Sequence, residues 1–360
     1  RIDRRSSHTL LTGRYVAELL DKTNIFAILA RGRLQPSLLE FVPVPYFRCL
    51  EMRALTLLPT LFCSVFLSAA AQAMTLRMPA PGDDVVGEVT MVHIARHADT
   101  LNDYARAYGF GFRELMAANP GINPWVPGEG RKVLMPGEFI LPPGERVGVV
   151  LNLAEQRLYY YQPDGKTVVT YPVGIGREDW QTPQLSTTVT KVVKDPSWTP
   201  PASIRREHAA MGDPLPAVVP PGPDNPLGPW AIRLAAPGYL IHGSNKELGV
   251  GMRVSHGCMR LYNEDVEEFA RLIKPGTPVR IIDVPVKVGW KGGAMYVEVH
   301  EALEEKRAYH VPEEAVADAI SVANRVAGQP AEIDWLEAKA AAVQRSGLPM
   351  RVSSQKIASR

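Results

Sequence analysis

The first 51 residues of this 360-residue chain contain no methionine, and the first methionine is Met52. We therefore expect residues 1–51 to be translation upstream of the true start rather than part of the native protein. After Met52 come one basic residue, an apolar run over 54–70 and a small-x-small pattern over 71–73. These features predict a cleaved secretory signal peptide, Met52–Ala73. The apolar run is short for a bilayer span and contains proline and serine, so we expect no membrane span after cleavage.

Cysteine is also scarce, because only Cys258 lies beyond the predicted signal peptide. A single thiol cannot form an internal disulfide, and the other histidines show no metal-type spacing, so we expect no metal site and no cofactor. Those histidines are His93, His97, His208, His300 and His310. A free thiol is a liability in an oxidising export compartment, which indicates that Cys258 is kept for its reactivity.

Neither sign of charge is in excess. Of 40 basic and 38 acidic residues, nine basic and five acidic ones lie in 1–73, which leaves about −2 for the mature part. A protein without excess positive charge has no general electrostatic attraction for nucleic acid, so we expect no nucleic-acid partner. With 46% hydrophobic and 22% charged residues, the composition is typical of a globular protein with two or three domains.

Residues 89–141 are expected to fold as a small strand–helix–helix–strand module. The predicted elements are a strand over 90–94, helices over 101–108 and 112–118, and a strand over 132–135. Thr100 or Asp99 suits the N-cap of the first helix. Asn119-Pro120 ends the second helix, because proline disfavours helical geometry in the residue before it.

This module resembles the LysM family, which binds the glycan chains of peptidoglycan and chitin. The residues that carry the resemblance are Asp99-Thr100-Leu101, Tyr104-Ala105, Tyr108, Leu115, Asn119-Pro120, Gly128 and Leu134-Met135-Pro136. Ala98 stands where the family normally has glycine. The resemblance implies a glycan-binding module, and a structural spacer is the alternative.

Residues 146–283 are rich in β-branched and aromatic runs, which predict a mainly β domain. Its predicted strands are 147–153, 157–162, 167–173, 186–193, 230–235, 239–242 and 279–282. The one strong helix begins after Asn263, its predicted N-cap, and ends near Ile273. Residues 195–229 hold ten prolines between two of the strands and favour an ordered wall or lid over a disordered loop.

Residues 284–360 are expected to form a small α/β extension. The predicted elements are strands over 286–290 and 294–300 and helices over 313–327 and 334–347. The extension has no cysteine and no clustered polar constellation. We therefore expect it to be structural or partner-binding.

Two short motifs are expected to carry the chemistry. His242 ends an apolar strand, and sixteen residues later Cys258 lies in the motif Ser255-His256-Gly257-Cys258. An imidazole within reach of a thiol produces the thiolate that attacks a carbonyl carbon. The alternatives are an inert buried thiol and a core histidine, but the glycine-rich frame around both residues favours a catalytic pair.

Backbone groups are expected to complete this pair. The N–H groups around Gly257 and Cys258 offer an oxyanion hole for a tetrahedral intermediate. No acidic residue lies beside His242 in the sequence. A backbone carbonyl is therefore the expected partner that orients the imidazole.

The two motifs resemble the signature of the YkuD-type L,D-transpeptidases, in which a histidine precedes a Ser/Thr-His-Gly-Cys motif. The resemblance implies that Cys258 is the nucleophile, that His242 is the base and that the carbonyl of Gly243 orients the base. It implies substrate-binding or oxyanion roles for Tyr239, Ser255, His256, Gly257 and Arg260. Arginine in place of the asparagine often found two residues after the cysteine is usual in Gram-negative members, where it suits a substrate carboxylate.

Wider similarity to the ErfK/YbiS/YcfS/YnhG group of this family runs through most of the predicted mature chain. It is carried by residues 150–161, 225–228, 232–236 and 251–254. The group consists of periplasmic enzymes with a signal peptide, a LysM-like module, a catalytic domain and a C-terminal extension. The resemblance implies a β-sandwich-like catalytic fold and a periplasmic location.

The implied reaction is a two-step acyl transfer on the tetrapeptide stems of peptidoglycan. The thiolate of Cys258 attacks the carbonyl at the L-centre of meso-diaminopimelate and expels D-alanine, and an amine then attacks the thioester. A lysine of an outer-membrane lipoprotein is the favoured acceptor. Diaminopimelate of another stem would give a 3→3 cross-link, and water would make the enzyme an L,D-carboxypeptidase. A non-catalytic peptidoglycan-binding protein is the alternative from another class.

Overall fold

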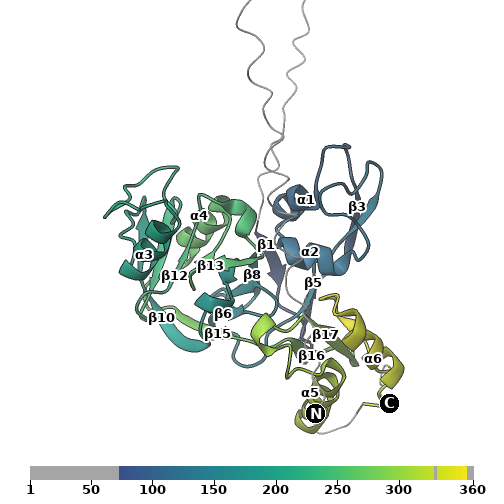
Figure 1. The fold of residues 1–360 in the computed structure, drawn as a ribbon. Helices are drawn as coiled ribbons and strands as arrows, with labels where there is room; N and C mark the ends of the chain where they lie inside the picture. Colours follow the sequence, from purple (N-terminus) through teal and green to yellow (C-terminus); the bar gives the residue numbers. More distant parts are fainter. Residues whose placement is uncertain (1–72, 328–330, 355–360) are drawn as a thin grey trace, which may run out of the picture. The chain divides into compact units, whose positions relative to one another are not determined.

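The computed structural model of the protein describes residues 73–327 and 331–354 (Figure 1). The predicted upstream segment 1–51, and all of the predicted signal peptide except Ala73, lie outside these residues. None of the helices in the described part of the chain has the length and apolar character needed to cross a membrane.

The elements predicted for the N-terminal module are present in the predicted order. β3 (Thr90–His93) pairs antiparallel with β4 (Lys132–Met135), and α1 (Leu101–Tyr108) and α2 (Phe112–Ala118) lie between them in sequence. Thr100 is the N-cap of α1: its side chain accepts from Asp103 N, and Asp103 Oδ2 accepts from Thr100 N at 2.8 Å. The identification of this module with LysM stays a prediction.

Two strands that the sequence analysis missed precede this module. β1 (Met74–Arg77) joins the edge of the central sheet, and β2 (Val85–Gly87) pairs with β5 (Glu138–Ile140). Strands of three or four residues beside proline and glycine carry too few alternations to be recognised from sequence.

The central sheet has nine strands in the order β1-β8-β7-β6-β15-β10-β11-β12-β14. The bounds of its remaining strands are β6 (Gly148–Asn152), β7 (Arg157–Tyr161), β8 (Thr167–Pro172), β10 (Leu185–Lys194), β11 (Trp230–Leu234), β12 (Leu240–His242), β14 (Met259–Arg260) and β15 (Pro278–Ile282). Neighbours are antiparallel except for β6–β15 and β12–β14. β9 (Ile175–Gly176) and β13 (Arg253–Ser255) form a separate parallel pair.

One curled sheet takes the place of the two stacked sheets expected from a β-sandwich. The first half of β10 pairs with β15 and its second half with β11, with a register shift between Val189 and Lys191. A bulge of this kind bends a strand, so β10 turns the sheet back on itself. Strands from both ends therefore share one core, whose members include Val149, Leu158, Tyr171, Ile232, Ile241 and Met259.

The helix α4 (Asn263–Leu272) packs on this core through Val266 and Phe269. Its N-cap is Tyr262, so the prediction that Asn263 is the N-cap was wrong by one residue. The side chain of Asn263 is engaged elsewhere, with the backbone of Ser244.

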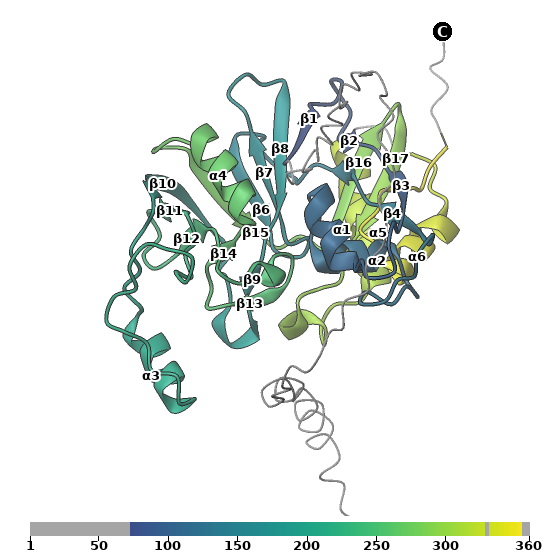
Figure 2. The same cartoon turned by 90° about the horizontal axis from the view of Figure 1, so that it is seen from above.

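The proline-rich segment 195–229 is ordered and contains a helix that its composition concealed. α3 (Ala202–Ala210) is set off from the central sheet, on the side where β9 and β13 lie (Figure 2). At the base of the segment, Trp198 and Val219 form a β-bridge. The buried side chain of Asn225 donates to the carbonyl of Pro196 at 2.7 Å and thus ties the two ends together.

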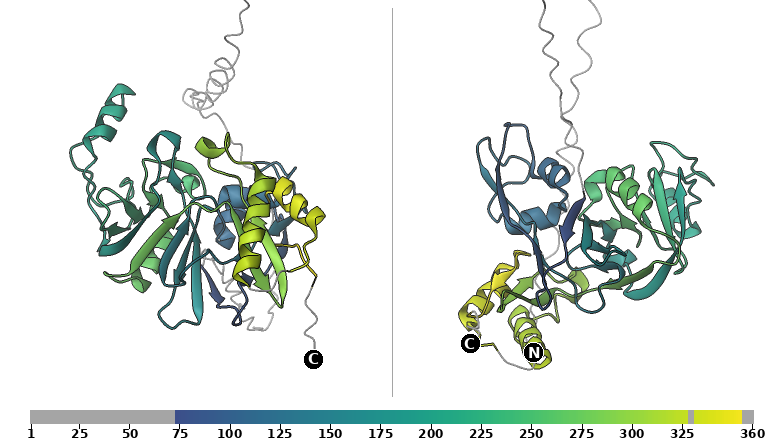
Figure 3. Two further views of the ribbon diagram at one scale, coloured as in Figure 1. Left: turned by 90° about the horizontal axis from the view of Figure 1, so that it is seen from below. Right: turned by 180° about the vertical axis from the view of Figure 1, so that it is seen from behind.

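The C-terminal extension has its own small sheet and core. The sheet consists of β16 (Val286–Lys291), β17 (Ala294–Val299) and the unexpected β18 (Met350–Arg351). Two helices, α5 (Pro312–Val326) and α6 (Trp335–Gln344), lie beside this sheet (yellow-green to yellow in Figure 3) and share its apolar core. Short 3₁₀ helices elsewhere are η1 (Glu178–Trp180), η2 (Glu247–Gly249) and η3 (Glu304–Lys306).

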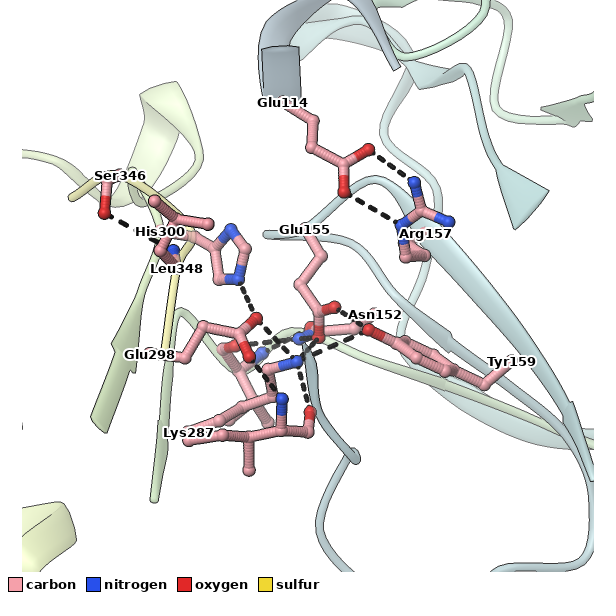
Figure 4. A network of polar contacts seen from close by, with 12 residues as sticks. Glu114, Asn152, Glu155, Arg157, Tyr159, Lys287, Glu298, His300, Ser346 and Leu348 are labelled. Carbon is pink, nitrogen blue, oxygen red and sulfur yellow. Dashed lines mark hydrogen bonds and ion pairs between the residues drawn. The ribbon is translucent and has the colours of Figure 1, made fainter. Parts of the chain in front are cut away.

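A buried ion cluster joins the extension to the rest of the protein (Figure 4). Lys287 Nζ lies 2.9 Å from Glu155 Oε1 and 2.7 Å from Glu298 Oε1, and it donates to the carbonyl of Ile140 at 2.5 Å. Lys287 and Glu298 belong to the extension, whereas Glu155 follows β6 and Ile140 ends β5. Removing Lys287 would leave two buried carboxylates without this counter-ion, so these parts of the chain depend on one another.

Candidate active site

His242 and Cys258 come from neighbouring strands of the central sheet. In the parallel pair β12–β14, Ile241 lies opposite Met259 and His242 lies opposite Arg260. Ile241 and Met259 are fully buried in the core. Because side chains alternate along a strand, the side chains of His242 and Arg260 lie on the other face of this pair. Cys258 directly precedes β14, and the charge of Arg260 acts on both His242 and Cys258, so the predicted base, the predicted nucleophile and this arginine lie close together.

His242 is buried and contacts the backbone of the next residue. Its Nδ1 lies 2.6 Å from the carbonyl oxygen of Gly243, which is the contact that the family resemblance implies. A carbonyl oxygen can only accept a hydrogen bond, so Nδ1 carries the proton and Nε2 is the basic nitrogen.

Asn263 holds the turn that follows His242. Its Oδ1 accepts from Ser244 N, and its Nδ2 donates to Ser244 O, both at 2.9 Å. A Cβ at position 243 would lie 2.4 Å from Asn263 Oδ1, so glycine is required beside this amide. Sequence reasoning missed this role, because Asn263 lies nineteen residues after Ser244 and no local pattern relates them.

Ser255 and Thr182 shape the turn that carries Cys258. Ser255 Oγ donates to Cys258 O at 2.5 Å and accepts from Gly257 N at 3.1 Å. Thr182 Oγ1 donates to Gly257 O at 2.9 Å. Gly257 has a φ of 98°, a conformation that favours glycine. The Gly257 amide, one of the two expected in an oxyanion hole, is thus already bonded to Ser255.

The thiol and the imidazole are both neutral in the resting site. Burial raises the pKa of the Cys258 thiol, against smaller opposing effects of the Leu240 backbone and the Arg260 charge. Burial, followed by the charge of Arg260, lowers the pKa of His242 to about 3, against the opposing bond to Gly243. A neutral pair of this kind needs the imidazole to remove the thiol proton as the sulfur attacks.

Arg260 places a half-buried positive charge beside both groups. Its charge acts on His242 and Cys258 alike, and burial lowers the pKa of Arg260 itself. Its Nε is buried and has no hydrogen-bond partner among the described residues. An unmade hydrogen bond of this kind costs about 1–3 kcal/mol. A carboxylate that reached this side chain would recover part of that cost.

His256 connects the nucleophile motif to the proline-rich segment. Its Nε2 lies 3.0 Å from Glu207 Oε2 of α3 and 3.2 Å from Arg177 Nη1. Arg177 also pairs with Glu207 at 2.5 Å, and the ring of Trp180 packs edge-on against His256 with the centroids 5.0 Å apart. The helix α3 therefore contacts the Ser255–Cys258 motif through Glu207, and its role as a wall or lid stays a prediction.

Tyr239 also lies at the motif. A Cβ on Gly257 would be 3.2 Å from Tyr239 Cε1, which places the ring against the turn before Cys258. The structure thus brings all eight predicted site residues to one region, around the ends of β12, β13 and β14. The residues that sequence reasoning missed there are Thr182, Arg177, Trp180, Glu207 and Asn263. Of these residues, only Glu207 lies in a segment that the sequence marked as unusual, through its proline content.

Three residues elsewhere have the geometry of a metal-binding group. Glu155, Glu298 and His300 bring their ligand atoms within 4.8 Å of one another, a grouping that histidine spacing in the sequence did not indicate. The ammonium group of Lys287 already bonds both carboxylates, and His300 Nε2 lies 2.6 Å from Glu298 Oε1. The positive charge that these carboxylates require is therefore supplied by Lys287.

Comparison with known proteins relates this site to one family. The family model described as the L,D-transpeptidase catalytic domain (YkuD) matches residues 146–281. The chain is 40% identical over 296 residues to the Escherichia coli (strain K12) protein named "Probable L,D-transpeptidase ErfK/SrfK", covering 81% of this chain and 95% of that protein. From the same organism, "Probable L,D-transpeptidase YcfS" is 45% identical over 252 residues (69% and 79% covered), and "Probable L,D-transpeptidase YbiS" is 38% identical over 308 residues (84% and 100% covered). The chain therefore belongs to the YkuD family and is an L,D-transpeptidase of peptidoglycan.

Proposed function

We propose that the protein transfers a peptidoglycan stem through a thioester on Cys258. His242 Nε2 takes the thiol proton while the sulfur attacks the diaminopimelate carbonyl of a tetrapeptide stem. The bond from that carbonyl to D-alanine breaks, and the leaving nitrogen takes the proton from His242. An acceptor amine then attacks the thioester, gives a proton to His242 and releases the thiol. The observation that carries this proposal is the position of Arg260, which lies opposite His242 in β12–β14 and whose charge acts on both His242 and Cys258.

Arg260 supplies the proposed recognition of the stem. Its charge stabilises the thiolate as it forms and opposes protonation of His242, so the imidazole passes its proton on to the leaving group. Its unpartnered Nε suits a substrate carboxylate, because a guanidinium and a carboxylate form a charge-assisted hydrogen bond. We place the action in the periplasm, with glycan binding by the N-terminal module.

Mass measurement of the intact protein tests the proposed function. After acid quenching of a reaction with disaccharide tetrapeptide, we expect a mass increase equal to the stem without its terminal D-alanine. Adding a lysine-ended peptide or a second stem in separate reactions identifies the acceptor, and we expect the lysine amine to discharge the adduct faster. D-alanine release that no amine accelerates would instead indicate a carboxypeptidase. Retention on sacculi without any adduct would indicate a non-catalytic binding protein.

Arg260→Gln is expected to raise the KM for tetrapeptide by about 10- to 100-fold, because the mutant loses a charge-assisted contact to a carboxylate. The measurement is D-alanine release from stems in which the carboxylates are amidated one at a time. Amidation of the carboxylate that Arg260 binds should abolish the difference in KM between wild type and mutant. A difference of the same size with every amidated stem would contradict this role.

A further inference from the structure

An acidic pair in the C-terminal extension reaches the strand that leads to the nucleophile. Arg253 of β13 lies two residues before Ser255, and its side chain is only 6% exposed. Its Nη1 donates to Glu305 Oε2 at 2.6 Å and also bonds Glu304 Oε2, and its Nη2 donates to Glu305 Oε1 at 3.2 Å. The guanidinium is thus held by two carboxylates about fifty residues further along the chain.

The remaining nitrogen of Arg253 continues this chain of contacts towards the nucleophile. Arg253 Nε donates to the carbonyl of Gly176 at 3.1 Å. Gly176 N donates to Thr182 Oγ1 at 2.9 Å, and Thr182 Oγ1 donates to the carbonyl of Gly257 at 2.9 Å. Gly257 immediately precedes Cys258. These hydrogen bonds, joined through the backbone of Gly176, therefore link Glu305 to the peptide group between Gly257 and Cys258.

The acidic pair is fixed in place and stays charged. Glu304 also pairs with Arg113 of α2 at 3.1 Å, which ties it to the N-terminal module. Burial alone would raise the pKa of Glu304, but bonding to Arg253 together with the charge of Arg113 brings it down to about 2. Bonding to Arg253 likewise outweighs burial and lowers the pKa of Glu305. Both carboxylates are ionised over the whole range in which the enzyme would work.

We propose that Glu304 and Glu305 are positioning residues of the transpeptidase, which act on Cys258 through Arg253, Gly176 and Thr182. They hold Arg253 in the one place where its Nε reaches Gly176, and this fixes the turn at Gly257 from which the thiol points. A displacement of about 1 Å at a reacting atom costs roughly 100-fold in rate. The C-terminal extension is therefore part of the catalytic apparatus. This inference rests on the proposed role of Cys258 as nucleophile.

The test compares two charge-removing variants in the same segment. Glu305→Gln removes one carboxylate from Arg253, whereas Glu301→Gln removes one whose ion-pair partners among the described residues are Arg307 and Arg345. We expect Glu305→Gln to lower kcat for D-alanine release by about 10- to 100-fold with little change in KM. Glu301→Gln should stay within about twofold of wild type. Rates are expressed per folded molecule, with the folded fraction taken from urea unfolding curves.

A purely structural role for the acidic pair would leave kcat per folded molecule unchanged, and that result would overturn the inference. Arg253→Lys keeps a charge but cannot bond Gly176 and Glu305 together, so it should lower kcat as Glu305→Gln does. The double variant Arg253→Lys/Glu305→Gln should have a kcat no lower than that of the slower single variant, because both substitutions interrupt the same series of contacts. Additive losses would also contradict the inference. If Cys258→Ala released D-alanine at the wild-type rate, the proposed function itself would fail, which is a separate outcome.

Discussion

Replacing Cys258 with alanine is expected to lower D-alanine release by roughly 10⁴-fold or more, because no other group can form the covalent intermediate. The intact-mass adduct with the stem should disappear as well. The fold should persist, because the hydrogen bond that the thiol donates is long, 3.5 Å to the carbonyl oxygen of Gly238. The measurement is D-alanine release alongside the urea unfolding midpoint, which should move by less than the equivalent of about 1 kcal/mol.

Cys258→Ser is the matched variant for this experiment. A serine hydroxyl has nearly the size of the thiol but a much higher pKa, so a base as weak as His242 activates it poorly, and this variant should also be inactive. Retention of both variants on insoluble sacculi would separate binding from turnover. Wild-type turnover in Cys258→Ala would refute the nucleophile assignment and favour a chemistry that does not use the thiol.

His242→Asn is expected to reduce the rate of thioester formation by roughly 10³-fold near pH 7, within the range assigned to a general base. Because burial raises the pKa of the Cys258 thiol, the thiol is protonated at neutral pH and depends on His242 for its ionisation. As the pH rises towards the pKa of the thiol, the thiolate forms unaided. The ratio of wild-type to mutant rate should therefore shrink with increasing pH.

The wild-type pH profile provides a second check on His242. Its pKa is lowered to about 3, so the imidazole is neutral and basic at every pH above that value. Protonation should lower the rate of thioester formation only as the pH falls towards 3, and no inflection is expected near 6.5. His97→Asn, at an exposed histidine in the N-terminal module, is the control and should follow the wild-type profile. A clear inflection near 6.5 in the wild type would show that His242 titrates as an ordinary exposed histidine.

The protein surrounds its catalytic domain with contacts from both flanking regions. On the N-terminal side, Arg106 of α1 pairs with Glu247 at 2.7 Å and with Glu264 at 3.0 Å. Glu247 lies in the loop between His242 and Cys258. On the C-terminal side, Glu304 and Glu305 hold Arg253 at the end of the same loop. The segment that joins His242 and Cys258 thus contacts residues outside the matched range 146–281.

Local sequence patterns were sufficient for much of the secondary structure. The N-terminal module was predictable because capping residues and Asn119-Pro120 mark its helix ends, and the hydrogen bond of Thr100 to Asp103 shows that the signal was physical. The strands β6, β7 and β8 followed from runs of β-branched and aromatic residues. The helix α3 was missed, because ten prolines dominate the composition around a nine-residue helix of weak amphipathic character.

The path of the central sheet could not be predicted in the same way. A sandwich and one curled sheet both require alternating apolar residues, so the pattern in the strands does not distinguish them. The register shift between Val189 and Lys191 decides between them, because it lets β10 serve two neighbours in succession. Nothing in the sequence of β10 marks this bulge.

The residues predicted to carry the chemistry are recognisable in the sequence, because the histidine, the Ser-His-Gly-Cys motif and the single cysteine beyond the predicted signal are all local features. The contacts around these residues are visible only in the folded structure. Four sets of contacts join distant parts of the chain. Asn263 holds the turn at Gly243 and Ser244, and Thr182 bonds Gly257. Arg253 bonds both Gly176 and Glu305, and Lys287 bonds two buried carboxylates. These contacts are strong because the polar groups are buried and paired with groups far away in the sequence. Pairs of this kind produce no periodic pattern along the chain. The sequence therefore suffices to predict a nucleophile and a base, whereas the residues that contact their surroundings are identified only in the fold.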